Sequence, residues 1–334
     1  MQSRDKDKYR HKGLRETSVN TIIGEIKYKR AMYEIHEEGI NKRVYLLDEK
    51  LKISVEGKVS SNLVEKVIET VPVTDSYRKA EQVIDTITNT SISHEKIRKI
   101  VLKIGDRITN KEKEEIKLYE KNQLIAGLKQ ITALFEETDG LWINLQGKDR
   151  QKRIENNKQQ VKIKNKEFNP KMKVKAELKL HVMYEGWKKD DIRHSLVNKQ
   201  YIAKEIAKLR DARVYSKYDE SKIKLRVTNG DGAKWTKGTT YKGGIYQKDQ
   251  FHIMQEITRD VPKEYRNIII ELINKKEFKQ IRPAIDGLKY ELNGEYQALK
   301  KLDKLKSYLS SDLDRYQDIV KVPQAPDGIE YRNL

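Results

Sequence analysis

The sequence predicts an α+β protein with a small N-terminal β element, a helical region and then a mixed sheet followed by more helices. Residues 222–228 alternate apolar and basic side chains and run into Asn229-Gly230-Asp231-Gly232, as expected for a half-buried strand that ends in a turn. Residues 174–182 alternate in the same way. Residues 60–126 and 262–320 instead space their apolar residues by three and four, which indicates amphipathic helices.

The charge of the chain favours a polyanionic partner. The 334 residues contain 70 Lys and Arg against 51 Asp and Glu, a net charge of +19. Clustered cations bind nucleic acid because they release counterions from phosphates, so we expect double-stranded DNA rather than a membrane surface. A basic surface that is merely solvated is the alternative. The sequence has no cysteine, which excludes disulfides and thiolate metal sites and is consistent with a cytoplasmic protein. It also has no membrane-spanning apolar run.

The N-terminal part, residues 1–58, is predicted to be a basic arm followed by a small β element. Residues 1–18 are basic and lack an apolar period, so we expect an extended arm. Residues 19–53 alternate in three short runs, which predicts antiparallel strands.

Residues 59–128 are predicted to form a helical DNA-binding region. Ser60 or Ser61, Asp75 and Ser93 are suitable N-caps for three successive helices, and a further charged helix is expected over residues 111–128. A short polar turn, residues 88–92, precedes the third helix. This helix-turn-helix layout predicts DNA contact through a basic outer face, although a solvated face would look the same. The residues concerned are Lys96, Arg98, Lys99 and Lys103.

Residues 129–258 are predicted to form the catalytic sheet. An apolar run, 131–135, leads to Asp139, and Gly140 is expected to turn the chain into a second strand, which makes a hairpin with acids at its tip. His181, in the strand that follows, is expected to be exposed. Residues 148–175 are expected to be a flexible basic loop along a phosphate backbone; the alternative, which is compatible with it, is a disordered surface insertion. Its DNA contacts would come from Arg150, Lys152 and Arg153.

Acidic residues at the ends of these strands are the candidate chemical groups. Asp231 follows a predicted strand, where α/β sheets carry ligands, and a short strand-like run, 250–253, brings up Asp249 and His252. An Asp-Gly pair is also an ordinary turn. If the sheet brings Asp139 and Asp231 together, two carboxylates can hold Mg²⁺ for phosphodiester chemistry.

Three segments, FEETDGLWINLQG, RVTNGDGAKW and YQKDQFHIMQ, resemble those of bacterial insertion-sequence transposases of the ISLre type. That group is Mutator-like and has a ribonuclease-H-like catalytic domain. The resemblance implies DNA cleavage and strand transfer by a DDE mechanism with Mg²⁺ or Mn²⁺, and multimers are usual in such transposases. Asp139 would match the first acid and Asp231 the second, and Asp249 and His252 match a D-x-x-H motif. Residues 259–334 would match the helical insertion of the group.

The chain departs from that pattern at its ends. In the family, a glutamate follows the stretch that resembles EYRNL, whereas this chain ends at Leu334; Glu330 is not assigned that role. The N-terminus also begins inside the usual length of the family. We therefore expect a truncated transposase that binds DNA and catalyses poorly. A non-catalytic basic DNA-binding protein, which would act through residues 75–108 and 148–175, is the alternative.

Overall fold

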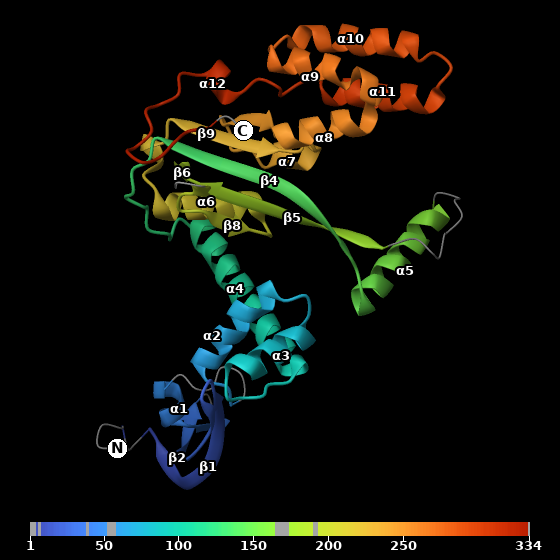
Figure 1. Ribbon diagram of the computed structural model, residues 1–334. Helices are drawn as coiled ribbons and strands as arrows, with labels where there is room; N and C mark the ends of the chain where they lie inside the picture. The colour runs from blue at the N-terminus through green and yellow to red at the C-terminus, as the bar shows by residue number, and fades with distance from the viewer. Residues whose placement is uncertain are drawn as a thin grey trace. The chain divides into compact units, whose positions relative to one another are not determined.

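The computed structural model describes residues 5, 8–37, 40–51, 58–163, 174–189 and 193–332, and the chain divides into two compact units. Unit 1 covers Met1–Lys113 and unit 2 covers Glu114–Leu334 (Figure 1). Each unit combines helices with strands, which confirms the predicted α+β class. The finer four-part division stays a prediction. None of the described helices is long and apolar enough to cross a bilayer.

Unit 1 begins with a three-stranded antiparallel sheet of order β1-β2-β3, formed by Arg10–Thr21, Gly24–Glu37 and Ile40–Val44. This confirms the predicted β element. It also corrects the expected arm, because residues 10–18 belong to β1, while residues 1–4, 6 and 7 lie outside the described part. The expected last strand is only partly correct, since Leu46–Leu51 forms α1. Buried Asp48 of α1 accepts a hydrogen bond from Tyr28 at 3.0 Å and pairs with Arg30.

Three helices follow: α2 (Ser61–Thr70), α3 (Tyr77–Ile87) and α4 (His94–Glu120), with η1 (Val71–Val73) after α2; the last residues of α4, from Glu114 on, belong to unit 2. Ser60 caps α2 as predicted, but Ser76 rather than Asp75 caps α3 through the Lys79 amide at 3.3 Å. The α4 helix is continuous where two helices were expected, because Gly105 and Asn110 cost too little to break it. The helices share a core of Leu63, Val67, Ala80, Ile84, Ile97 and Ile100.

Unit 2 contains a five-stranded mixed sheet of order β10-β9-β4-β5-β8. The strands are β4 (Ala133–Asn144), β5 (Lys175–Tyr184), β8 (Gln200–Ile202), β9 (Leu225–Gly230) and β10 (Ile245–Lys248). Strands β4, β9 and β10 run parallel, whereas β5 is antiparallel to β4 and β8. Shorter elements connect or flank these strands: β6 (Trp187–Lys189), β7 (His194–Leu196), α6 (Ile206–Lys217), η2 (Glu220–Lys222) and α7 (Lys234–Gly238).

The predicted hairpin at Gly140 is wrong. The β4 strand runs straight through Asp139 and Gly140 to Asn144, and it pairs with β5 from Phe135↔Tyr184 to Asn144↔Lys175. Gly140 is opposite Lys179 and needs no turn conformation. The apolar run after Gly140 is therefore the continuation of one long strand and not its partner.

The expected flexible loop is also partly wrong, because Gly147–Ile163 forms α5. Polar residues with good helix propensity, such as Lys, Arg and Gln, support a helix without giving it an apolar face. Residues 164–173 of the predicted loop lie outside the described part.

The C-terminal part of unit 2 is helical. Helices were predicted over residues 262–320, and the structure has η3 (Lys263–Tyr265), α9 (Arg266–Asn274), α10 (Phe278–Glu291), α11 (Tyr296–Tyr308) and α12 (Tyr316–Ile319) there. The helix before them, α8 (Gln250–Asp260), corrects the strand-like run that was expected at residues 250–253. Gly294, with a φ of 103°, separates α10 from α11. Pro283 does not divide helices as expected but lies inside α10, where burial of Ile281, Ile285 and Leu288 offsets the lost backbone hydrogen bond.

Candidate active site

Three aspartates occupy one row across the three parallel strands. Thr138 pairs with Gly230, and Gly230 pairs with Lys248. Asp139, Asp231 and Asp249 each come one residue later. Because neighbouring strands lie about 5 Å apart, this register gathers the three aspartates at one edge of the paired region. The sequence left open whether the sheet brings Asp139 and Asp231 together, and the parallel register of β4 and β9 places them at the same edge. Their catalytic and metal-binding roles stay predictions.

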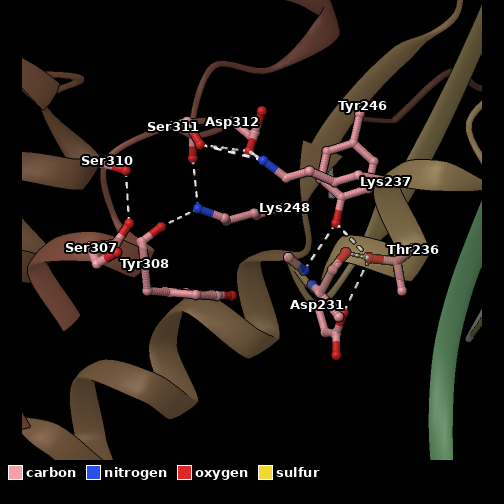
Figure 2. Close-up of polar contacts among 12 residues, drawn as sticks. Asp231, Thr236, Lys237, Tyr246, Lys248, Ser307, Tyr308, Ser310, Ser311 and Asp312 are labelled. Atoms are coloured by element: carbon pink, nitrogen blue, oxygen red, sulfur yellow. Dashed lines mark hydrogen bonds and ion pairs between the residues drawn. The ribbon is translucent and has the colours of Figure 1, made fainter. Parts of the chain in front are cut away.

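Asp231 is fixed by the turn that leaves β9. Its Oδ1 atom accepts hydrogen bonds from the Ala233 amide at 2.9 Å and from the Thr236 hydroxyl at 3.2 Å (Figure 2). The next residue, Gly232, has a φ of 89° and donates its amide to the Tyr246 hydroxyl at 2.9 Å. The other carboxylate oxygen, Oδ2, has no partner among the described residues. One oxygen thus orients the side chain and the other is available to a ligand.

Asp139 is more open. Its side chain is 64% exposed, and Oδ1 accepts the Gly140 amide at 2.7 Å and lies 3.9 Å from Nε2 of His252. Its Oδ2 also lacks a partner within the described part of the chain. The strand alternation of β4 places Asp139 on the same face as Glu137.

Asp249 and His252 lie on a helix and not on the expected strand. Asp249 is the N-cap of α8 and accepts the Phe251 amide at 2.8 Å. Its position explains the helix, because an aspartate before an apolar-periodic run is a strong start signal. The spacing of three residues places both side chains on one side of the first turn, where Nδ1 of His252 lies 3.4 Å from Oδ2 of Asp249.

The acids favour a protonated His252. The hydrogen bond to Asp249 raises the pKa of His252 against a smaller effect of burial, and the charges of Asp249, Asp139 and Asp231 add to the rise. Burial opposes ionisation of Asp249, but hydrogen bonds from His252 and the Phe251 amide hold its pKa below the ordinary value. The site therefore places three carboxylates around a histidine whose pKa they raise.

The donor set fits a hard divalent cation only through Asp139 and Asp231. Each has one carboxylate oxygen without a protein partner, and oxygen is the ligand that Mg²⁺ prefers. Both oxygens of Asp249 are engaged, by the Phe251 amide and by His252. Among the described residues, no group of three or more His, Cys, Asp or Glu could hold a metal ion. An ion there would keep water or phosphate oxygens for most of its coordination shell.

A buried ion cluster supports the strands from the opposite face of the sheet. Glu136 is fully buried and pairs with Arg226 at 2.8 Å and with Arg210 of α6 at 3.6 Å. His181 belongs to this cluster, so its expected exposure is wrong: it is buried and shares a 2.8 Å hydrogen bond with Thr138. The face of β5 on which it lies is covered by α6. Burial lowers the pKa of His181 to about 4, which keeps the ring neutral.

A buried lysine joins the C-terminal helices to the same edge. Lys248 is 3% exposed, and its ammonium donates to the backbone carbonyls of Ser311, at 2.7 Å, and Tyr308 (Figure 2). Its backbone amide donates to the Asp312 carbonyl at 2.9 Å, and its carbonyl accepts from Arg315 at 2.6 Å. The segment after α11 is thus held against β10, directly beside Asp249. Burial lowers the pKa of Lys248 to about 8.

Sequence reasoning missed Lys248 and Glu137. Nothing in the alternation of residues 245–248 marks the lysine as buried. Glu137 could have been found from the spacing E-x-D, which places it on the face of Asp139. Its Oε1 accepts the Tyr184 hydroxyl at 2.6 Å, and burial, together with the charge of Asp249, raises its pKa.

The predicted DNA-contact residues lie on two helices in different units. On α4, Arg98, Lys99 and Lys103 are exposed and Lys96 is half-buried; Arg98 pairs with Glu95 at 3.0 Å. On α5, the exposed residues are Arg150, Lys152 and Arg153. No described contact joins these residues to the aspartate row.

The fold and the site define an α+β protein with an aspartate row and a histidine at the edge of a mixed sheet. The chain belongs to UPF0236, described as an uncharacterised protein family, whose model matches residues 1–169 and 161–321. Two relatives from Caldanaerobacter subterraneus subsp. tengcongensis, both UPF0236 proteins, are 24% identical over 299 residues. The match covers 87% of this chain and 55% and 52% of those relatives. The chain thus spans about half the length of the curated relatives that it matches.

Proposed function

We propose that this chain is part of a DNA transposase of the DDE type, similar to the ISLre group, that cleaves and joins DNA strands at the aspartate row. The observation that carries the proposal is the register of β4, β9 and β10, which aligns Asp139, Asp231 and Asp249. Acids that are far apart in the sequence and close together on one sheet suit phosphodiester chemistry, because their carboxylates can hold a metal ion at the point where the phosphate reacts.

Each side chain has a distinct part in this proposal. Asp139 and Asp231 would hold Mg²⁺ or Mn²⁺ through their available Oδ2 atoms. When bound, such an ion makes water or a 3′-hydroxyl more nucleophilic and stabilises the departing oxygen. Thr236 and the Ala233 amide fix the orientation of Asp231. Asp249 keeps His252 protonated, so that Nε2 can donate a hydrogen bond to a phosphate oxygen beside Asp139.

The basic helices would hold the DNA. Lys96, Arg98, Lys99 and Lys103 on α4 fit a phosphate backbone in unit 1, and the cations of α5 fit one in unit 2. A homo-oligomer agrees with the working form that is usual in such transposases. The third acid of the DDE mechanism is not assigned to a residue of this chain. The complete cleavage and joining activity is proposed for the whole protein, and this chain covers about half of its relatives' length.

Metal-dependent nicking of supercoiled plasmid tests this function. The chain, and an extended form lengthened to the full length of its relatives, are incubated with Mn²⁺ beside Asp139→Asn and Asp231→Asn. Asp314→Asn, an exposed acid on the loop before α12, is the matched control. We expect nicking by the extended form that both site substitutions abolish and the control leaves unchanged. Nicking that survives both site substitutions would refute the proposal.

A second candidate function is DNA binding without chemistry. The observation that favours it is the limited donor set: among the described residues, only Asp139 and Asp231 of the row have an available oxygen, whereas the chain carries a net charge of +19. In that case both forms bind DNA in EDTA, neither nicks with Mn²⁺, and Asp139→Asn and Asp231→Asn bind as the parent chain does.

A further inference from the structure

The strands β4 and β5 extend beyond the rest of the sheet as a two-stranded ribbon. The pairing of β9 with β4 ends at Thr138, and β8 pairs with β5 only at residues 181–183. Within the described part of the chain, residues 139–144 and 175–180 therefore pair only with each other. Figure 1 shows β4 and β5 side by side and running toward α5. The ribbon thus starts at Asp139 and leads away from the aspartate row to a helix.

The ribbon exposes apolar side chains. Leu141 is 53% exposed, Trp142 59% and Ile143 41%, and Leu180 of β5 is also exposed. Leu141 and Ile143 share the face of Asp139, whereas Trp142 lies on the opposite face. Several large apolar side chains gathered on one narrow element mark an interaction surface more often than isolated ones do.

The helix next to the ribbon, α5, carries an excess of positive charge. Its described side chains include five cations and two acids, and all seven are exposed: Lys148, Asp149, Arg150, Lys152, Arg153, Glu155 and Lys158. A helix that is polar all round is poorly stabilised by its own chain, so a partner would stabilise it. The partner that fits is a polyanion that also offers apolar groups. Duplex DNA has both, because its phosphates are negatively charged and its stacked bases form an apolar interior.

We propose that the β4–β5 ribbon lies in the major groove of the DNA duplex beside the cleavage point, with α5 on the flanking phosphates. A two-stranded ribbon has the width that the major groove admits. Leu141, Trp142 and Ile143 would contact base edges and thymine methyl groups from the two faces of the ribbon. This proposal rests on the proposed function only for the DNA partner; the ribbon needs no catalysis in order to bind.

Charge also argues against a second copy of the chain as the occupant. If two copies met ribbon to ribbon in a close symmetric contact, each would bring its own α5 with its excess of cations, and like charges at short range are unfavourable. Duplex DNA instead satisfies the cations and the apolar side chains together.

The test follows the accessibility of Trp142 in EDTA, where no cleavage occurs. Acrylamide quenching of tryptophan fluorescence is measured for the full chain with and without a 30-base-pair duplex. Trp187 is buried and Trp235 is half-buried, so Trp142 is the most exposed of the three tryptophans. We expect the duplex to protect the parent chain from acrylamide, and we expect no added protection in Trp142→Phe.

Affinity gives a second readout. Trp142→Ala and Leu141→Ser should each weaken duplex binding about tenfold, whereas Tyr290→Ala, at a still more exposed aromatic on α10, should leave it unchanged. Duplex binding at full affinity with Trp142 still open to acrylamide would overturn the proposal. Protection of Trp142 that increases with protein concentration in the absence of DNA, together with a doubled mass in sedimentation, would show that a second copy of the chain covers the ribbon. That result would also overturn the proposal.

The two proposals fail separately. Asp139→Asn should abolish nicking and still protect Trp142 in the presence of DNA. If DNA protects Trp142 but the extended chain never nicks, the transposase function fails and the ribbon stands. If the extended chain nicks in an Asp139-dependent way while Trp142 stays accessible, the ribbon proposal fails and the function stands.

Discussion

The ring of His252 lies 3.9 Å from the carboxylate of Asp139, although the two residues come from α8 and β4. This contact depends on Asp249, which holds the other ring nitrogen at 3.4 Å. Asp139 therefore faces a histidine whose charge is set by a second aspartate of the same row. A substitution of Asp249 can therefore change the charge of His252 while both predicted metal ligands, Asp139 and Asp231, stay intact.

Removing the charge of Asp249 should lower the pKa of His252. The contact in which the Asp249 carboxylate accepts from the His252 ring is the largest cause of the raised pKa, so Asp249→Asn should move the value down toward or below 6.5. The measurement is a metal-free NMR titration of histidine-labelled protein, with His252→Gln to assign the signal. Asp314→Asn is the control and should not move it. A His252 signal that titrates alike in Asp249→Asn and in the parent would contradict this account.

Lys248 should make stability rise with pH above about 8. Its pKa is about 8 in the folded protein against 10.5 when unperturbed. Between these values the unfolded chain binds more protons, so this contribution to the free energy of unfolding increases with pH, by about 3 kcal/mol at most. Urea unfolding from pH 7.5 to 10.5 measures it. Lys248→Met should lack the rise, whereas Lys237→Met, at a more exposed lysine of the same cluster, should keep most of it, because burial lowers the pKa of Lys248 more than the charge of Lys237 does. Equal slopes in Lys248→Met and the parent would exclude a buried ammonium.

Local pattern predicted the elements better than it predicted their connections. Alternation and capping located β9, α2, α3 and most of α4, because these depend on neighbours in the chain. The turn predicted at Gly140 was wrong because a glycine permits a turn but does not require one. The pairing of β4 with β5 keeps the chain extended there. The alternation at His181 marked two faces of β5 but could not show that α6 covers the face of the histidine. Asp139 and Asp231 could be proposed from the sequence, whereas their alignment required the parallel register of β4 and β9.

The buried ion cluster should be essential for stability. Glu136→Ala would leave Arg226 and Arg210 without the acid that neutralises them inside the sheet, and breaking a buried pair in this way costs about 3–5 kcal/mol. Urea unfolding gives the value. Glu120→Ala, which removes an exposed partner of Lys208, should cost about 1 kcal/mol or less. Similar losses in the two variants would mean that the cluster contributes no more than a surface pair.

The basic face of α4 should appear in the salt dependence of DNA binding. Replacing Lys96, Arg98 and Lys99 by glutamate should weaken binding and reduce the slope of log K against log salt by about 2 or more, because each lost phosphate contact removes about 0.9. Fluorescence anisotropy over a range of salt concentrations measures both effects. Lys66→Glu is the control, because Lys66 of α2 already pairs with Glu69 at 2.7 Å. An unchanged slope in the triple variant would remove α4 from the interface.

A side chain at Gly232 should lower the stability of the protein more than a side chain at Gly243, a glycine with a similar backbone conformation. Gly232 and Gly243 have φ values of 89° and 87°, so alanine meets the same backbone strain at both positions. At Gly232, an added Cβ would lie 2.9 Å from Cε of Lys248 and 2.9 Å from Cε2 of Tyr308, whereas at Gly243 it would meet nothing within 4 Å. Gly243→Ala should therefore cost about 1 kcal/mol, and Gly232→Ala should cost about 1–3 kcal/mol more. Thermal unfolding of the two variants separates strain from crowding. Because the segment after α11 is held against β10 by hydrogen bonds from the Lys248 and Tyr316 amides, Gly232→Ala should also increase hydrogen exchange at these two amides. Equal stability of the two variants would show that the turn after Asp231 is not packed against Lys248 and Tyr308.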